Sequence, residues 1–226
     1  MKKKVRNNKV ILASILALGC LTAASVGFSS WVIAAQDTST RPFNVNVTVA
    51  DVEDHRFKVK ASSDSRIKLG PSKQGTYISY SGSESEEDLN FNFKLTFTDN
   101  DDKAFDFTSL GDQSFNIKFS FTNINTLNIN DAKNTYIEFP PEKKTIGTIS
   151  KSGFTESSGA TATLSSNEIT YKGKLAWGSY FGGKNPSELD DSTKVDSYIA
   201  GLKHLKDCLK DNAAFEITVY IEKKVV

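Results

Sequence analysis

The residues best suited to recognition chemistry lie in one short segment, residues 177–186, which reads WGSYFGGKNP. Trp177, Tyr180 and Phe181 could stack on sugar rings or contact another subunit, because aromatic side chains bring a large apolar face to an interface. The alternative is a tight turn after a strand, with these side chains capping the core. The phosphate-loop pattern GxxxxGK[ST] is missing, so we do not expect a nucleotide site.

Histidine and acidic residues give no recognisable catalytic or metal site. The two histidines, His55 and His204, are far apart in the sequence, and the chain contains neither HExxH nor CxxC. His55 follows acidic residues that could supply ligand oxygens, but the solvated start of a strand explains the same pattern. These acidic residues are Asp51, Glu53 and Asp54. We therefore expect no enzymatic activity, no cofactor and no bound metal.

A second acidic cluster, Asp99, Asp101 and Asp102, could bind calcium. An EF-hand loop requires Gly at its sixth position and Glu at its twelfth. Counted from Asp99, those positions hold Ala104 and Leu110, so the motif is absent. A hairpin turn explains the cluster instead, because Asp and Asn favour turns.

Alternation of apolar and polar residues predicts the strands that must position these side chains. Apolar residues at every second position indicate one buried and one solvated face, as in antiparallel sheets. The four strongest alternations cover residues 43–49, 89–97, 115–121 and 215–221. Weaker candidates are residues 55–60, 76–80, 104–108, 135–139, 146–149 and 168–176.

One segment, Thr193 to Leu209, has helical spacing instead, and Thr193 or Ser192 could cap its start. Many short strands separated by turn residues predict a sandwich or jelly roll. We expect an all-β-dominated fold: an antiparallel β-sandwich, with a jelly roll as one form, and one C-terminal amphipathic helix before the last strand. Six apolar residues should share its core: Phe91, Phe93, Phe115, Ile117, Phe119 and Ile217.

The N-terminus has the layout of a secretory signal. Residues 1–9 are basic, residues 10–36 carry no charge, and small residues follow the apolar run VILASILALG. The uncharged run is also long enough to span a bilayer as a retained anchor. We expect residues 1–35 to be a signal peptide or a membrane anchor, the mature chain to start near Gln36, and residues 36–226 to form a single extracellular domain.

Charge and cysteine content limit the classes of partner. Five of the 28 basic residues precede the apolar run, so the rest of the chain has four more acidic than basic residues despite a net charge of +1. Such a domain lacks the charge balance typical of nucleic-acid binding. Cys20 lies in the signal segment, which leaves Cys208 without a disulfide partner after cleavage. We expect Cys208 to be a small buried hydrophobe on the predicted helix.

The junction between signal and domain resembles a known family. Its sequence, LGCLTAASVGFSSWVIAAQD, is similar to the start of TasA/camelysin-type exported proteins of Gram-positive bacteria, with Ser29-Ser30-Trp31 where that family has a small-aromatic element. The resemblance implies a jelly-roll-like domain that forms extracellular biofilm fibres by donating an N-terminal strand, and processing by a dedicated signal peptidase. It is confined to the N-terminal part of the chain, and RPFNVNVTVADV replaces the family's usual first strand.

Two functions remain open, besides an extracellular hydrolase that no motif supports. The first is a structural protein of the cell surface or extracellular matrix, which contacts its own copies or other surface proteins through residues 43–49. The second is a surface binding module for a glycan or protein, using residues 177–186. The first strand could complete its own sheet as an edge strand or add to a neighbour's sheet, where main-chain bonds give affinity. Its apolar positions are Phe43, Val45, Val47 and Val49.

Overall fold

Short strands dominate the computed structural model, which describes residues 43–50, 52, 54–72, 75–78, 87–209 and 213–225. In chain order the strands are β1 (Phe43–Val49), β2 (Lys58–Ser62), β3 (Arg66–Ile67), β4 (Asn90–Thr98), β5 (Phe115–Phe121), β6 (Ile137–Glu138), β7 (Lys144–Ser150), β8 (Gly153–Glu156), β9 (Ala162–Ser165), β10 (Glu168–Lys174), β11 (Ala176–Trp177) and β12 (Phe215–Lys223). The helical elements are α2 (Ile124–Leu127), α3 (Val195–Cys208) and the 3-10 turns η1 (Phe107–Leu110), η2 (Ser179–Phe181), η3 (Pro186–Glu188) and η4 (Ser192–Lys194).

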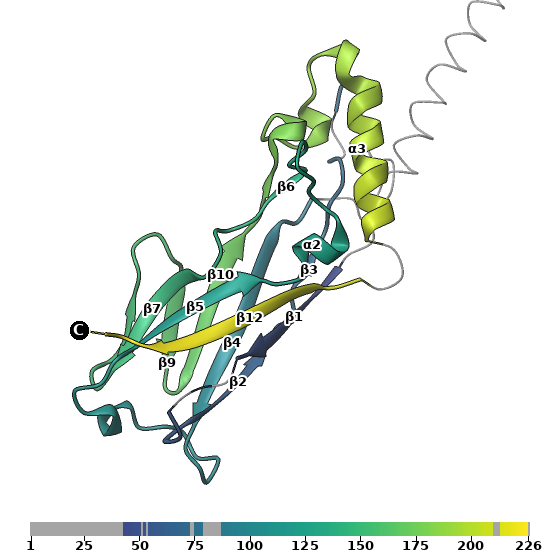
Figure 1. Cartoon of the computed structure of the whole chain (residues 1–226). Helices are drawn as coiled ribbons and strands as arrows, with labels where there is room; N and C mark the ends of the chain where they lie inside the picture. The colour runs from purple at the N-terminus through teal and green to yellow at the C-terminus, as the bar shows by residue number, and fades with distance from the viewer. Residues whose placement is uncertain are drawn as a thin grey trace, which may run out of the picture.

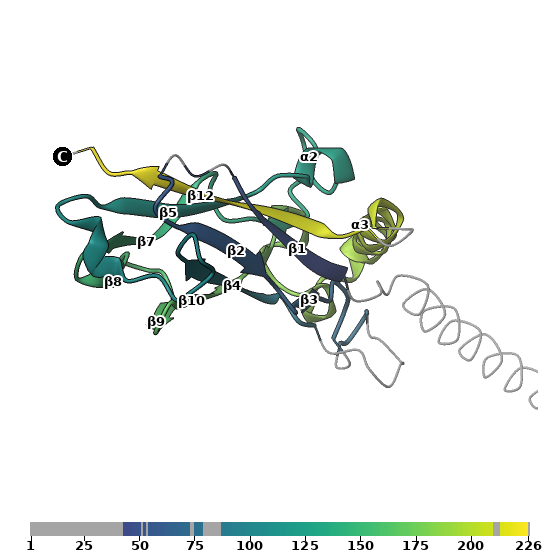
Figure 2. The same ribbon diagram turned by 90° about the horizontal axis from the view of Figure 1, so that it is seen from below.

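Two sheets lie face to face, and α3 lies at one end of them (Figures 1 and 2). One sheet has the strand order β3-β1-β12-β5-β7-β8, and the other has the order β2-β4-β10-β9. β6 and β11 pair separately near the helix. The expected fold class is therefore confirmed: the chain is strand-dominated, its sheets are largely antiparallel and form a sandwich, and one C-terminal helix precedes the last strand.

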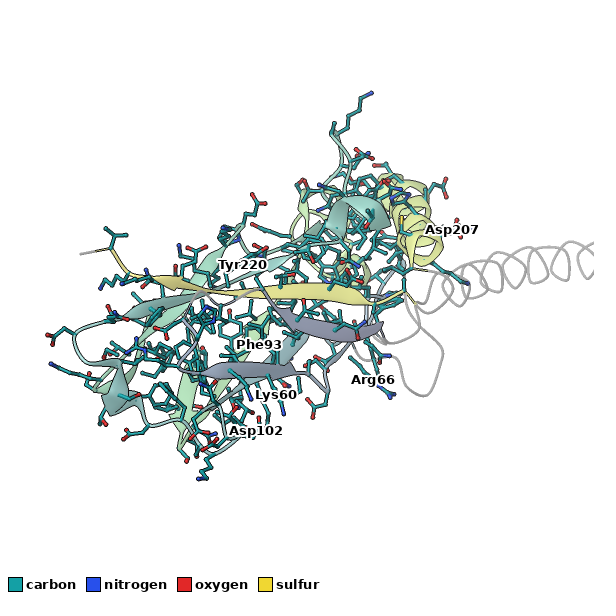
Figure 3. All side chains as sticks on the ribbon, turned by 60° about the horizontal axis from the view of Figure 1, so that its bottom comes forward. Lys60, Arg66, Phe93, Asp102, Asp207 and Tyr220 are labelled. Carbon is teal, nitrogen blue, oxygen red and sulfur yellow. The ribbon has the colours of Figure 1, made fainter. Side chains whose placement is uncertain are left out.

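The core lies between the sheets and is built mainly from aromatic rings. Alternate residues of β4 and β5 are buried, as the sequence pattern predicts. The ring of Phe119 on β5 contacts Phe93 and Tyr171 across the sandwich, with centroids 5.6 and 5.0 Å apart, and Figure 3 labels Phe93 at this interface. All six residues expected in the shared core are at most 2% exposed, which confirms that prediction.

The first strand and the last strand lie side by side. β1 pairs with β12 in parallel, from Val45 opposite Phe215 to Val49 opposite Val219, whereas the other pairings of the described strands are antiparallel. On its other side β1 meets the two-residue strand β3. This parallel pair is a departure from the purely antiparallel sandwich that alternation alone predicts.

Residues 104–108 do not form the expected strand. Ala104 makes an isolated bridge to Thr98, and the chain then turns into η1, where the Asp106 carboxylate accepts a hydrogen bond from the backbone N–H of Thr108. Phe105 and Phe107 are nevertheless buried, so their spacing imitates that of a strand. The sequence prediction was wrong here because a capped turn can bury two residues that are two positions apart.

The other weak candidates are partly confirmed. Strand β2 begins three residues after the expected start at residue 55, and residues 168–176 divide at Leu175 between β10 and β11. Residues 76–78 are not a strand, and residues 79 and 80 lie outside the described residues. The short strands β3, β8 and β9 were not predicted.

Helix α3 closes one end of the sandwich. It starts at Val195, because η4 precedes it, and its N-cap residue Lys194 makes no side-chain cap bond. The capping side chain lies one element earlier: Asp191, rather than Thr193 or Ser192, caps η4. The Asp191 carboxylate accepts from the backbone N–H and the hydroxyl of Thr193, at 3.0 and 2.6 Å. The helix buries Val195, Tyr198, Gly201, Leu202 and Leu205.

The expected signal or anchor segment, residues 1–35, lies outside the described residues. Within the part of the chain that the structure describes, no helix is both long and apolar enough to cross a membrane.

Candidate functional site

The aromatic residues of segment 177–186 pack inward. Trp177 and Phe181 are 4% and 1% exposed, and their rings meet edge-on with centroids 5.2 Å apart. Tyr180 is half-buried, and its hydroxyl donates to the backbone carbonyl of Ser197 on α3. A sugar ring cannot reach the faces of Trp177 and Phe181 in this arrangement, so burial favours the alternative in which the segment caps the core.

Two glycines permit the close packing around Tyr180. A Cβ atom at Gly178 would lie 1.9 Å from the backbone oxygen of Thr135. A Cβ atom at Gly201 of α3 would lie 2.4 Å from the ring of Tyr180. Both positions therefore need glycine because a backbone or a ring occupies the space of a side chain. The result is that Tyr180 lies on the ring of Tyr136, with centroids 4.5 Å apart.

A buried polar cluster centred on Asn185 holds the end of this segment. The Asn185 side-chain oxygen accepts from the backbone N–H groups of Ser187 and Ser72, at 2.9 and 3.2 Å. Its amide donates to the Gly70 carbonyl and to the Glu87 carboxylate, at 3.1 and 2.7 Å. The other Glu87 oxygen accepts from the indole N–H of Trp177 at 2.7 Å. Asn185 is 5% exposed, so the cluster ties three distant segments together inside the fold.

Tyr136, His204 and Cys208 form a second group next to the helix. The Tyr136 and His204 rings stack with centroids 4.7 Å apart. The Cys208 sulfur lies 3.3 Å from His204 Nε2, and its thiol donates to the Asn128 carbonyl at 3.3 Å. Cys208 is half-buried rather than fully buried, which corrects the sequence expectation, and burial raises the pKa of its thiol.

β1 is the other candidate site, and its two faces differ. On one face Phe43 and Val45 are buried and Val47 and Val49 are half-buried. The residues of the other face are exposed: Asn44, Asn46 and Thr48. The strand hydrogen-bonds to its own β12 through a five-residue register, so in this structure it completes its own sheet. The sequence pattern alone could not decide whether this strand is internal or donated, because both have the same alternation.

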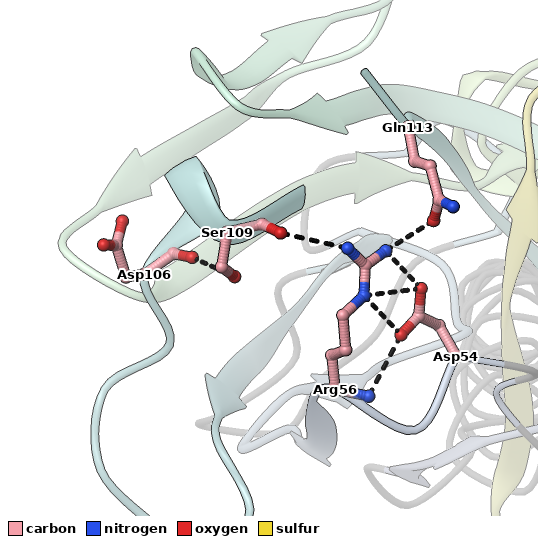
Figure 4. Close-up of polar contacts among 5 residues, drawn as sticks. All are labelled: Asp54, Arg56, Asp106, Ser109 and Gln113. Carbon is pink, nitrogen blue, oxygen red and sulfur yellow. Dashed lines mark hydrogen bonds and ion pairs between the residues drawn. The ribbon is translucent and has the colours of Figure 1, made fainter. Parts of the chain in front are cut away.

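An arginine cluster fixes the chain just after β1 (Figure 4). The Arg56 guanidinium donates to both oxygens of the Asp54 carboxylate, with Nε 2.9 Å from one of them. It also donates to the backbone carbonyl of Ser109 at 3.0 Å and to the side-chain oxygen of Gln113. Asp106 bonds to Ser109 in turn, through its carbonyl and the Ser109 hydroxyl. The start of β2 is thus tied to the loop before β5.

Basic neighbours lower the pKa values of several carboxylates, among them Asp54 and Glu222. The hydrogen bond from Arg56 holds the pKa of Asp54 below its usual value. Hydrogen bonds from Lys118 and Lys143 lower the pKa of Glu222, which lies near the end of β12. The Glu222 pairs link β12 to the neighbouring β5 and to the residue before β7, whereas the Asp54–Arg56 pair lies within one segment. Both carboxylates make structural contacts.

The structure shows a hydrogen-bonded turn at one of the two acidic clusters noted in the sequence, and it describes the other cluster only in part. The Asp99 carboxylate accepts from the backbone N–H groups of Asp101 and Lys103, both at 2.9 Å, as in a hairpin turn. Beside His55, Asp54 is bonded to Arg56, while residues 51 and 53 lie outside the described residues. Within the described ranges, no group of three or more His, Cys, Asp or Glu side chains is arranged to hold a metal ion.

No protein-family model, curated protein or solved structure matches this chain. The resemblance of residues 18–37 to TasA/camelysin-type proteins therefore stays a prediction, and so do the export and the partners that it implies.

Proposed function

We propose that this chain is an exported structural protein of the cell surface or extracellular matrix, whose subunits join by exchange of β1. Export is expected from residues 1–35, in which a basic stretch precedes an apolar run and small residues. The observation that carries the exchange is the position of β1, an N-terminal strand that inserts in parallel beside the last strand of the domain.

Main-chain bonds and two side chains hold β1 in place. The backbone ladder to β12 does not depend on which copy of the chain supplies the strand. Phe43 and Val45 fill positions on the buried face. A copy of residues 43–49 from a neighbouring subunit can therefore make the same contacts, with the same register, that a subunit's own strand makes.

Exchange of β1 requires the chain to change direction between Val49 and Asp54. Ala50 still donates to Val219 of β12, at 2.8 Å. From Asp54 onward the Arg56 cluster fixes the chain to its own domain. A hinge in this short stretch would release β1 and leave the rest of the sandwich intact.

The competing function, a binding module that uses residues 177–186, loses support from burial. Two of its three aromatic side chains, Trp177 and Phe181, are enclosed in the core. Tyr180 is engaged with Tyr136 and with the backbone of α3. We therefore propose a structural role for this segment.

A chain that starts at Val52 tests the proposal, mixed with a synthetic peptide covering residues 40–51. Exchange predicts a soluble monomer that does not polymerise and that binds the peptide. A peptide carrying Val45→Lys is the matched control and should not bind, because Val45 is 3% exposed. A truncated chain that still forms fibres, or one that aggregates and ignores the peptide, would show that β1 is an ordinary internal strand.

A further inference from the structure

The outward face of the four-stranded sheet carries a row of lysines. On β2, β4 and β10 the residues that alternate with the buried ones point to solvent. Five of these exposed residues are lysines, and Lys60 is labelled on the outer side of β2 in Figure 3. They are Lys58, Lys60, Lys94, Lys172 and Lys174.

The strand register arranges these lysines as a single diagonal line. In the register with β4, Lys58 is opposite Thr98 and Lys60 is opposite Thr96. The next outward position of β4 is Lys94 itself. On the far side of β4, Lys172 is opposite Asn92 and Lys174 is opposite Asn90. Each two-residue step along β4, from Thr98 to Asn90, therefore holds one lysine, and the line crosses from β2 to β10.

The spacing of this lysine row follows from sheet geometry. Two residues along a strand are about 6.7 Å apart, and a diagonal step to the next strand is about 8 Å. The lysine positions thus form a regular series along this sheet face. The net charge of the whole chain does not reveal the lysine row, because acidic residues outnumber basic residues elsewhere in the chain.

Few negative charges offset the lysine row. On the described strands of this sheet face, Glu168 is the one outward carboxylate, and it pairs with Lys94 at 3.1 Å. Lys58 pairs with Asp102 at 3.5 Å, but both side chains are about half or more exposed, so solvent screens this contact. Within the described residues, Lys60, Lys172 and Lys174 have no ion pair.

A small pocket lies where the lysine row ends on β10. Its volume is about 320 Å³. Lys172 and Lys174 line it together with Lys144, the first residue of β7, and with Asn90 and Thr161. Three lysines and two residues with uncharged polar side chains among its lining residues suit a phosphate group, which accepts several hydrogen bonds.

We propose that the lysine row binds an extended phosphodiester polymer whose phosphates are joined by polyols or sugars, with a terminal phosphate in the pocket. A three-carbon linker in extended form separates successive phosphates by a distance comparable to the lysine spacing. The outward residues of this face are Lys, Asn, Thr, Ser and Glu, with no aromatic ring on which a nucleic-acid base could stack. The row therefore fits a polymer without bases.

A second copy of the chain fits the lysine row less well. On the outer face of β1, β5 and β12 the carboxylates are Glu216 and Glu222. Glu222 is already paired with Lys118 and Lys143, at 2.7 and 3.0 Å. This face therefore offers no matching row of negative charges. Binding of the polymer is also independent of whether β1 is exchanged, so failure of one proposal leaves the other standing.

The test measures binding of poly(glycerol phosphate) chains to the protein as recovered from producing cells, at several salt concentrations. The key variant is Lys60→Gln/Lys172→Gln/Lys174→Gln. The control is Lys133→Gln/Lys184→Gln/Lys203→Gln, which removes three exposed charges elsewhere. For five contacts we expect a plot of the logarithm of affinity against the logarithm of salt concentration to have a slope of about −3.5. The key variant should reduce the magnitude of that slope by about two and should lower the affinity about tenfold.

The control variant should bind as the wild type does. Equal losses in both variants, or no binding by the wild type at low salt, would overturn the proposal. Oligothymidylate that binds as tightly as poly(glycerol phosphate) would overturn the assignment to a polymer without bases. Lys144→Gln should weaken the binding of polymer chains that end in phosphate and should not change the binding of chains that end in a hydroxyl. An equal effect on both kinds of chain would show that the pocket is not part of the site.

Discussion

The ring of Phe43 meets the ring of Phe215 edge-on, with centroids 6.1 Å apart and planes at 79°. Phe43 begins β1 and Phe215 begins β12, so this contact joins the two ends of the domain. Phe215 also contacts Phe121 and Phe139, with centroids 6.1 and 5.8 Å away. Phe43 therefore anchors the first strand in an aromatic cluster at one end of the sheet, in addition to the main-chain bonds to β12 and the buried Val45.

Truncation of this anchor should weaken the docking of β1. Phe43 is 4% exposed, and Phe43→Ala should reduce the free energy of unfolding by about 3–5 kcal/mol through the lost transfer energy and the cavity. Chemical denaturation followed by circular dichroism measures the change. Val225→Ala is the control, since Val225 is 92% exposed, and it should change nothing. Equal stability of Phe43→Ala and the wild type would mean that β1 does not dock as described.

The Asn185 cluster should matter more than any exposed residue of its segment. Asn185→Ala leaves the buried Ser187 and the Glu87 carboxylate short of partners, and should cost about 1–3 kcal/mol of stability. The loss should also alter Trp177 fluorescence, because the indole shares Glu87 with Asn185. Lys184→Ala, an exposed neighbour, is the control. If both variants melt at the same temperature, the cluster does not hold the segment.

Acid should weaken the Arg56 cluster. The pKa of Asp54 is lower in the folded chain than in the unfolded chain, so the unfolded chain binds this proton first as the pH falls. The stabilisation is complete above the ordinary carboxyl range, near pH 4, and is lost as the pH falls through the folded pKa. Asp54→Asn should therefore lower the melting temperature at pH 7, and the difference from the wild type should shrink toward pH 2.

Asp64→Asn is the control for that titration, because Asp64 is exposed and is not a partner in the hydrogen bonds of Arg56 to Asp54, Ser109 and Gln113. A constant difference between Asp54→Asn and the wild type across this pH range would mean that the ion pair does not stabilise the fold.

The mature chain should start near Gln36. Ile33-Ala34-Ala35 offers small residues immediately before the polar stretch QDTST, as a signal peptidase requires. N-terminal sequencing of the exported protein decides the position. A start at Val26 would move the cut to Ala23-Ala24-Ser25, and an intact Met1 in the membrane fraction would mean a retained anchor.

The sequence predicts the strong strands well, because in β4 and β5 burial and alternation coincide. Phe105 and Phe107 show where the pattern fails: their spacing is that of a strand, but Asp106 between them is the extended cap of η1, which begins at Phe107. Strand β8 escapes prediction because its residues do not alternate between buried and exposed. Strand β9 does alternate, but it is four residues long and has only two apolar positions, Ala162 and Leu164. In these cases the tertiary packing, rather than local propensity, decides the structure.

The candidate sites were harder to predict than the fold. Trp177 and Phe181 were identified by residue type, but only the packed structure shows that both are buried. The partners of Asn185 and Arg56 come from positions far away in the sequence, so no local pattern reveals them. The lysine row requires the pairing register of three strands, which the sequence of each strand does not contain.

Disulfide trapping between β1 and β12 tests the central claim, exchange of the first strand, most directly. Thr48 and Thr218 are partners in the parallel register, and neighbouring strands lie about 4.8 Å apart, within the reach of a disulfide. The chain would carry Thr48→Cys and Thr218→Cys, with both native cysteines replaced by Ser, and would be oxidised after assembly. Exchange predicts a ladder of covalent multimers on a non-reducing gel, absent for Thr48→Cys alone. Assembled material that yields only monomers with an internal disulfide would contradict it.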